Sequence, residues 1–366
     1  MATEALPLAA SAPTAMRVVT YNVLSSSLAG ADHFVACSSD DLDASMRLRR
    51  VKSQLDEQLA AGAVICLQEV SSKWAGELTP YFEQHGYTVV TGLYGNRFNG
   101  YMGCALAWPR SKYQSERVDI VRGSDTKPWP KLPSKTATGG WPRWRALKDL
   151  CTRMVLRREP PAQRVDPWAE AARRQNILLS AQLRCKASGQ SFCVSTYHMP
   201  CLFGSTEKVQ VMVIHCALVA NYAARFAEGL PHLLCGDFNF VPSSPPYQVA
   251  TQGALPDGDV HVPPTREHDK WEANVAAPLR SAYPLALGTE PSFTNFAKTK
   301  WDAEGSAFME TLDYIFVSGE WDVRQVKPLP NKADLPDELK SYPSRTEPSD
   351  HLMLWAELEL RPTPSK

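Results

Sequence analysis

Polar side chains that could bind a metal ion recur where apolar, strand-like runs of this sequence begin or end. Neighbouring strands end at a common edge of a sheet, so side chains placed in this way converge on one site. A lone Asp or Asn at a strand end is usually a turn or a helix cap. So many in one chain indicate a functional site instead. The residues are Asn22, Glu69, His198, Asp237, Asn239, Asp313, Asp350 and His351.

The strongest single motif is Gly236-Asp237-Phe238-Asn239, which follows the apolar run Leu233-Leu234-Cys235. Two ligating side chains spaced two residues apart point the same way from an extended backbone. Together, the carboxylates, amides and imidazoles suit a hard, oxygen-preferring cation such as Mg²⁺ or Mn²⁺ and not a thiolate zinc site. We therefore expect one or two such ions as the cofactor.

Strands and helices alternate along the whole sequence, which favours an α/β fold with sheets packed inside helices. Helices are predicted at 45–61, where apolar residues recur at spacings of three and four, and at 207–228, which ends before Gly229. No linker separates two units, so we expect a disordered lead over residues 1–15 and one catalytic domain over 16–362. Strands are predicted at 17–23, 63–68, 87–92, 103–108, 177–185, 191–197, 231–235, 313–318 and 351–360.

The composition is that of a globular protein, with 366 residues, 44% of them apolar, and a formal net charge of zero. Zero net charge argues against an overall polycationic nucleic-acid binder, although it leaves room for a local basic groove. The first sixteen residues hold no Lys or Arg and resemble neither a secretory signal nor a transit peptide. No window approaches the ~18 apolar residues of a transmembrane segment.

Nine cysteines are present, an odd number, and none forms a C-x-x-C pair. Several lie inside apolar strand-like runs, so we interpret them as buried, reduced thiols. Reduced thiols point to a reducing compartment. We expect a cytoplasmic protein, with a nuclear location as the alternative, and a monomer.

The segment 127–174 breaks the pattern of strands and helices. It holds twelve Lys or Arg against four Asp or Glu, a formal charge of +8, together with seven prolines and four tryptophans. One interpretation is a substrate-facing flap in which Lys and Arg meet phosphates and Trp stacks on bases. The other is a proline-rich surface loop whose tryptophans pack locally.

The motifs around the candidate ligands resemble, in order and at plausible spacings over residues 17–360, those of the endonuclease/exonuclease/phosphatase superfamily. This resemblance implies a four-layer α/β sandwich, in which two packed mixed β-sheets are flanked by helices. It also implies a phosphodiesterase dependent on a divalent metal. The matching motifs are Thr20-Tyr21-Asn22-Val23-Leu24, Leu67-Gln68-Glu69-Val70, Tyr197-His198, Gly236-Asp237-Phe238-Asn239, Leu312-Asp313-Tyr314-Ile315-Phe316 and Ser349-Asp350-His351.

The resemblance also implies a role for each candidate. Glu69 would hold one metal ion with Asn22 and Asp350. A second metal site, or the attacking water, would lie among Asp237, Asn239 and His351. Asp313 would orient His351, and His198 would donate to a phosphate oxygen. Whether Asp237 or His351 accepts the proton from water stays open.

Within the superfamily, the residues of these motifs resemble those of the nocturnin- and Angel-like deadenylase branch. Phe293-Thr294-Asn295 ahead of Leu312 is shared with it, and Phe308 stands where that branch has an aromatic that stacks on a base. The branch commonly has a proline five residues after the strand-end His, and Phe203 takes that place here. We therefore expect Phe308, Asn295 and Phe203 to contact substrate, without a fixed preference for poly(A).

Four functions are compatible with these motifs. The best supported is a Mg²⁺-dependent 3′-exoribonuclease acting on RNA or oligonucleotides. A lipid or small-molecule phosphodiesterase, of the sphingomyelinase or inositol-phosphatase type, and a DNA-repair endonuclease are alternatives. A catalytically inactive scaffold is the least supported, because the complete ligand set is present.

Overall fold

Two six-stranded sheets form the centre of the molecule. The computed structural model describes residues 14–130, 166–302 and 304–361. In the first sheet the strand order is β13-β14-β1-β2-β4-β3, with β1 and β2 parallel and the other neighbours antiparallel. Its strands are β1 (Ala15–Asn22), β2 (Val64–Val70), β3 (Tyr87–Leu93), β4 (Gly103–Pro109), β13 (Trp321–Val326) and β14 (Leu354–Leu360).

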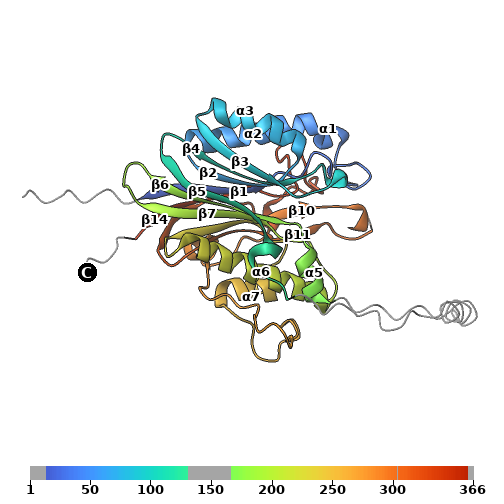
Figure 1. Ribbon diagram of the computed structural model, residues 1–366. Helices are drawn as coiled ribbons and strands as arrows, with labels where there is room; N and C mark the ends of the chain where they lie inside the picture. The colour runs from blue at the N-terminus through green and yellow to red at the C-terminus, as the bar shows by residue number, and fades with distance from the viewer. Residues whose placement is uncertain (1–13, 131–165, 303, 362–366) are drawn as a thin grey trace, which may run out of the picture.

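The second sheet has the order β5-β6-β7-β8-β12-β9, and here β7 and β8 are the parallel pair. A short separate hairpin of β10 and β11 lies at one end of the two sheets (Figure 1). The strands are β5 (Tyr113–Arg122), β6 (Ile177–Cys185), β7 (Ser191–His198), β8 (His232–Asp237), β9 (Arg280–Ser281), β12 (Asp313–Val317), β10 (Asn295–Ala297) and β11 (Phe308–Glu310).

Helices cover the outer face of each sheet, so the described residues form four layers (Figure 1). On the first sheet, α2 and α3 bury an apolar face that includes Val51, Leu55 and Trp74. On the second sheet, α5, α6 and α7 bury another that includes Val211 and Val249. The helices are α1 (Ser39–Leu42), α2 (Ala44–Ala60), α3 (Ser72–Gln84), α5 (Pro167–Arg173), α6 (Thr206–Ala227), α7 (Pro245–Gln252) and α8 (Ala282–Leu287).

The main core lies between the two sheets, where side chains such as Val18, Leu106 and Ile315 are fully buried. Between β2 and β7 a buried polar contact crosses this core: the Gln68 amide donates to the Thr196 hydroxyl at 3.0 Å. Gln68 lies one residue before Glu69 and Thr196 two before His198. A buried hydrogen bond between these strands therefore fixes how the two sheets align near the candidate site.

The predicted fold class is confirmed, and all nine predicted strands and both predicted helices are present. The prediction missed β5 and β13, as well as α3, α5, α7 and the shorter elements. β5 is an edge strand with mostly exposed side chains, so it offers no apolar run to detect. β13 spans six residues with only its two end residues buried, which gives no clear alternation.

By length and composition alone, α6 is apolar enough to cross a membrane. In the structure it packs on the second sheet, and 72% of its most apolar window is buried. This is the position of a core helix. It is the one such candidate among the described residues.

All eight cysteines in the described part of the chain are free, and six of them are buried. This agrees with the expectation of reduced thiols. Cys151 lies outside the described residues.

Both ends of the segment 127–174 are built into the fold, whereas residues 131–165 lie outside the described part. Trp129 and Trp168 pack edge to face at a centroid distance of 6.4 Å, and Trp168 packs on Trp271 at 5.9 Å. Lys127 forms an ion pair of 2.8 Å with Asp269. These two tryptophans therefore pack locally, as the second interpretation of this segment expects. Trp141 and Trp144 lie outside the described residues.

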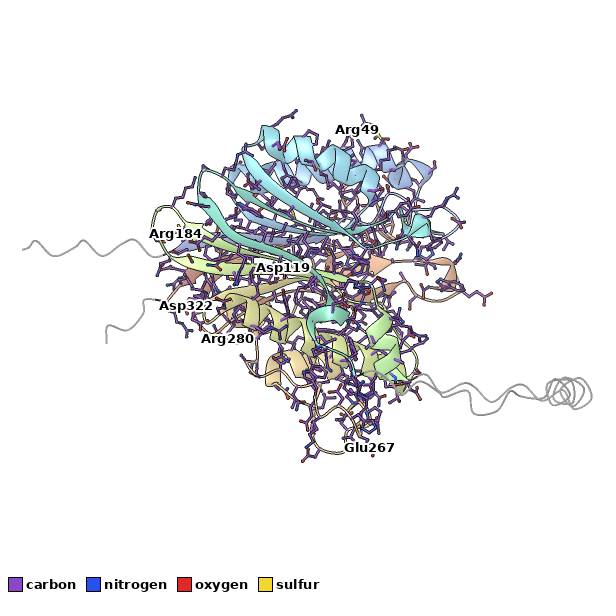
Figure 2. The ribbon with its side chains drawn as sticks, in the orientation of Figure 1. Arg49, Asp119, Arg184, Glu267, Arg280 and Asp322 are labelled. Atoms are coloured by element: carbon purple, nitrogen blue, oxygen red, sulfur yellow. The ribbon has the colours of Figure 1, made fainter. Side chains whose placement is uncertain are left out.

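Charged side chains lie at the periphery of the layers (Figure 2). Arg49 lies on the outer face of α2, and Glu267 lies on the loop beyond α7. Arg184 and Asp322 lie at the end of the sandwich opposite the β10 and β11 hairpin, and both take part in exposed ion pairs. Such exposed pairs contribute little to stability.

One carboxyl group, that of Glu347, is buried in the loop that leads into β14. The Tyr21 hydroxyl donates to its Oε1 at 2.6 Å, and Gln54 donates to its Oε2 at 3.3 Å. Burial raises the pKa of Glu347 to about 7, against the lowering by Tyr21 and by the charge of Lys327. The folded protein therefore holds this side chain as the neutral acid at mildly acidic pH.

We predict that Glu347 makes the protein less stable as the pH rises from about 5 to 8. The pKa is raised on folding, so its stabilising contribution is complete below the unfolded value near 4.5 and is lost through about 7. Glu347→Gln should flatten this decline and stabilise the protein at pH 8 by up to about 3 kcal/mol. Urea unfolding across pH 5–8 measures the effect, with the exposed Glu83→Gln as control. A parallel decline in Glu347→Gln and wild type would contradict the assignment.

Candidate active site

The register of the second sheet places three of the predicted residues in one row. His198 ends β7 and pairs with Asp237 at the end of β8, and Asp237 pairs with Asp313 at the start of β12. Gly236 is needed for this, because a Cβ there would collide with the Tyr197 carbonyl oxygen on the neighbouring strand. Three buried polar side chains therefore lie side by side at one edge of the sheet.

The first sheet supplies Asn22 at the end of β1 and Glu69 near the end of β2. The pairing of β2 with β4 is irregular between Leu67 and Val70, and Glu69 lies in this bulge with φ = 58°. A bulge redirects the side chain of a strand residue, here toward the second sheet. A left-handed conformation at a non-glycine residue is strained, which is common at functional sites.

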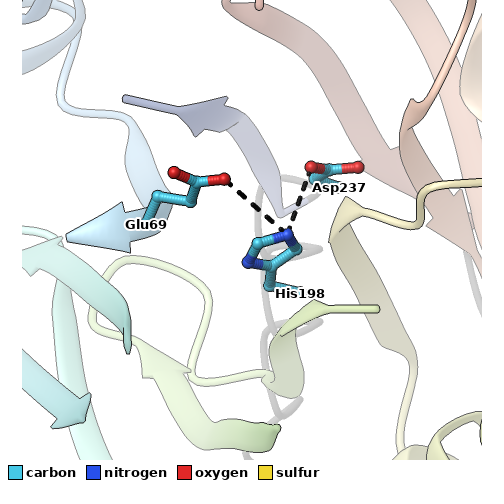
Figure 3. A group of neighbouring side chains, drawn as sticks. All are labelled: Glu69, His198 and Asp237. Atoms are coloured by element: carbon cyan, nitrogen blue, oxygen red, sulfur yellow. Dashed lines mark ion pairs between the residues drawn. The ribbon is translucent and has the colours of Figure 1, made fainter. Parts of the chain in front are cut away.

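Glu69, His198 and Asp237 form one compact group across the two sheets (Figure 3). His198 Nε2 lies 3.4 Å from Asp237 Oδ2 and 3.9 Å from Glu69 Oε1. The Asn22 amide nitrogen donates to Asp237 Oδ2 at 2.9 Å and to Glu69 Oε1 at 3.2 Å. The Ser25 backbone N–H donates to Glu69 Oε2 at 3.0 Å. Two carboxylates from different sheets therefore face one another around an amide and an imidazole.

A second group consists of Asp237, Asp313 and His351. His351 Nδ1 lies 2.8 Å from Asp313 Oδ2, and its Nε2 lies 3.7 Å from Asp237 Oδ2. The Thr294 hydroxyl donates to Asp313 Oδ2 at 2.6 Å. Asp313 can therefore hold the Nδ1–H tautomer of His351 and leave Nε2 facing the centre.

Burial and neighbouring charges have opposite effects on the pKa values of the His351 and Asp313 pair. Burial disfavours a charge on His351, but the carboxylates of Asp313, Asp237 and Asp350 outweigh it and raise the pKa of His351 well above its usual value. Burial raises the pKa of Asp313 to about 6, against the lowering by His351. The pair thus carries a strongly held proton in the absence of further positive charge.

Asp350 and Asn239 lie beside these groups in different ways. The Asn295 amide donates to Asp350 Oδ2 at 3.2 Å, and Asp350 is not part of the group around Glu69. The Asn239 backbone N–H donates to Asp237 Oδ1 at 2.9 Å, and its side-chain amide donates to the Met199 carbonyl at 3.0 Å. Asn239, with φ = 51°, therefore orients Asp237 directly.

Tyr94 is a neighbour of the site that sequence reasoning missed. It follows β3 in the first sheet, and its hydroxyl lies 2.9 Å from His198 Nδ1. Burial raises the pKa of Tyr94 well above its usual value, so the hydroxyl keeps its proton. Neither composition nor periodicity distinguishes this tyrosine from any other residue at a strand end.

Arg47, on α2, is a second missed residue and is fully buried. It donates to the carbonyls of Val23 and Leu24, which follow Asn22, and to that of Pro348, which precedes the Ser349 motif. Its guanidinium carbon lies 5.0 Å from the centre of the Trp74 ring. One side chain therefore fixes two loops that carry candidate ligands.

The donor set suits a divalent cation. Buried carboxylates from both sheets face one another, and an uncompensated pair of this kind is unfavourable in a low-dielectric environment. Glu69 and Asp237 offer carboxylate oxygens, the ligands that Mg²⁺ and Mn²⁺ prefer, with an imidazole alongside. The residues present therefore fit a hard cation held chiefly by Glu69 and Asp237.

The three predicted substrate-contacting residues lie in different places. Asn295 is buried at the start of β10, where it bridges to His351 and donates to Asp350. Phe308 is 38% exposed at the start of β11 and lines a surface cleft. Phe203 is 51% exposed on the loop between β7 and α6, outside that cleft.

Residues 19–351 match the Endonuclease/Exonuclease/phosphatase family. The chain belongs to this family. The match runs from β1 to His351 and so includes every predicted site residue. The resemblance inferred from the motifs is thereby confirmed.

Among characterised relatives, human 2′,5′-phosphodiesterase 12 is 26% identical over 362 residues, covering 94% of this chain and 51% of the human protein. Nocturnin from Drosophila melanogaster is 24% identical over 370 residues, covering 95% of this chain and 47% of that protein. The chain thus spans about half the length of these relatives.

Solved structures support the same fold. ANGEL2, described as a 2′,3′-cyclic phosphatase, superposes with a TM-score of 0.67 at 21% identity, covering 95% of this chain and 96% of that one. The human nocturnin catalytic domain with a bound sulfate gives 0.57 at 20% identity, covering 95% and 94%. At this identity the likeness concerns the sandwich architecture.

We predict that Glu69→Gly is more stable than Glu69→Ala by about 1 kcal/mol, because only glycine adopts φ near 58° without strain. Both variants remove the same carboxylate, so the difference isolates the backbone. At Glu357, in β14 with ordinary φ, the same comparison should favour alanine. Urea unfolding of the four variants tests this, and an alanine variant at Glu69 as stable as the glycine variant would exclude backbone strain.

Proposed function

We propose that this protein is a Mg²⁺- or Mn²⁺-dependent phosphodiesterase that hydrolyses RNA from its 3′ end. The observation that carries the proposal is the joint placement of Glu69, Asp237 and His198 beside the Asp313 and His351 pair. The family and its relatives support phosphodiester chemistry and nucleotide substrates.

Each of these side chains has a separate role in the proposed reaction. A divalent cation at Glu69 and Asp237 would neutralise charge on the phosphate oxygens and on the leaving oxygen. His198 Nε2 faces the same space and can donate to a phosphate oxygen, while Tyr94 holds its Nδ1 side. A cation held by Glu69 and Asp237 would also offset the carboxylate charges that raise the pKa of His351.

Proton transfer from the attacking water is best assigned to His351. Its Nδ1 faces Asp313 at 2.8 Å, so Nε2 is the nitrogen that points toward Asp237 and the centre. Asp313 stabilises the imidazolium that forms, as a carboxylate does for a catalytic histidine. Asp237 serves better as a cation ligand, because its Oδ1 already accepts the Asn239 backbone N–H.

Phe308 is the side chain that we assign to base stacking. It is partly exposed and lines the same cleft as Phe296, the residue after Asn295, whose amide donates to Asp350. Stacking of one base on an aromatic ring is worth ~1–3 kcal/mol and is tolerant of sequence. A lipid substrate is less well supported, because the cleft combines this ring with lysine side chains.

We predict stepwise shortening of 3′-hydroxyl RNA from its 3′ end in the presence of Mg²⁺. The substrates are 5′-labelled poly(A), mixed-sequence RNA, 2′,5′-linked oligoadenylate, RNA ending in a 2′,3′-cyclic phosphate, single-stranded DNA and duplex DNA. The linkage and end chemistry that turn over fastest define the specificity. Cleavage of none of these polymers by folded wild-type protein would contradict the proposal.

Two variants show whether the observed turnover comes from this active site and not from a contaminating nuclease. Glu69→Ala removes a cation ligand and should abolish turnover. Asp313→Asn keeps both carboxylates of the cation site but loses the partner that orients His351, so kcat should fall by roughly 10²- to 10⁴-fold. Asp322→Asn, at the opposite end of the sandwich, is the matched control and should retain full activity.

A further inference from the structure

A cleft of about 750 Å³ lies along the β10 and β11 hairpin. Its larger apolar side chains are Phe296, Phe308, Met309 and Leu339, and its cationic ones are Lys298, Lys332 and Lys340. An aromatic ring beside ammonium groups is the combination that binds a base together with its phosphate.

The cleft adjoins the candidate catalytic residues through the hairpin. Asn295 begins β10 and donates to Asp350, and the Phe296 backbone N–H donates to the Asp350 carbonyl at 2.8 Å. Lys298 follows Asn295 by three residues, which places it roughly 10 Å further along an extended backbone. A chain that leaves the catalytic residues along β10 therefore reaches Lys298.

Two of the three lysines have free charges. Among the described residues, neither Lys298 nor Lys340 has a carboxylate within 4.0 Å, whereas Lys332 lies 3.8 Å from Glu310. The other acidic residue of the lining, Asp302, accepts a hydrogen bond from the Thr299 hydroxyl at 2.8 Å. The Lys340 ammonium donates to the Asp337 carbonyl, which leaves its charge uncompensated. The lining thus offers an excess of one positive charge and two ammonium groups without a carboxylate partner.

Trp301 lies next to this cleft and is 80% exposed, which is unusual for a side chain of this size. Its backbone is nevertheless fixed, because Lys300 N–H donates to the His33 carbonyl at 2.8 Å and Thr299 bridges to Phe34. The Lys300 ammonium lies 5.2 Å from the centre of the indole ring. An exposed ring on an anchored backbone, beside a cation, offers a stacking surface that no described part of the chain covers.

We propose that this hairpin is an additional nucleotide subsite. It holds single-stranded RNA upstream of the bond that is cleaved, with Trp301 stacking on a base and Lys298 and Lys340 contacting phosphates. The inference rests on the proposed function, and it makes the preferred substrate an oligonucleotide of several residues instead of a dinucleotide.

The test compares Lys298→Met/Lys340→Met and Trp301→Ala with wild type on RNAs of two and eight nucleotides. Steady-state kinetics with Mg²⁺ are paired with fluorescence anisotropy in chelator, which reports binding without turnover. Arg184→Met removes a charge at the opposite end of the sandwich and is the control (Figure 2). All substituted side chains are at least partly exposed, so thermal unfolding should be unchanged.

For the eight-nucleotide RNA, we expect the double lysine variant to raise KM and Kd about tenfold and to reduce the salt dependence of log Kd by roughly 1.4. Trp301→Ala should weaken binding at least about fivefold. The dinucleotide and kcat should be unaffected. Wild-type values of KM and Kd in both variants, with RNA still cleaved, would refute the subsite alone. Absence of RNA cleavage and binding by wild type would refute the proposed function, and the subsite with it.

Discussion

The close approach of Glu69 and Asp237, one carboxylate from each sheet, is the constraint on which the rest of the site depends. The two carboxylates share a single amide donor, that of Asn22. Bringing like charges out of water is costly unless they are compensated. The sandwich meets this cost partly with backbone and amide donors and, in our account, with a divalent cation. Everything around the pair then serves to hold it in place.

Three structural features hold the two carboxylates and their neighbours in place. The bulge at Glu69 redirects its side chain out of the regular strand alternation and toward the second sheet. Arg47 donates hydrogen bonds both to the loop that follows β1 and to the loop that precedes Asp350. Tyr94 reaches from the first sheet to His198 in the second. Ligands that are distant in the sequence therefore share one rigid frame, which is what preorganised electrostatic catalysis requires.

Most of the fold and the candidate site could be predicted from the sequence, since apolar runs mark buried strands and motifs mark their ends. What could not be predicted depends on tertiary contacts. From the sequence, Arg47 is expected to be an exposed helix residue. Its burial depends on the distant backbone carbonyls that accept its hydrogen bonds. The hydrogen bond from the Asn295 amide to Asp350 joins residues far apart in the sequence, so it too follows only from the fold. Likewise, nothing local reveals that Trp168 packs against both Trp129 and Trp271.

The most direct test of the account is calorimetric titration of Mn²⁺ into wild type, Glu69→Gln and Asp237→Asn, with Asp322→Asn as control. The account predicts that wild type and the control bind Mn²⁺ alike, and that each ligand variant loses most of the affinity while remaining folded. Mn²⁺ binding of wild-type strength in both ligand variants would show that these two carboxylates do not hold the cation, and it would contradict the central claim.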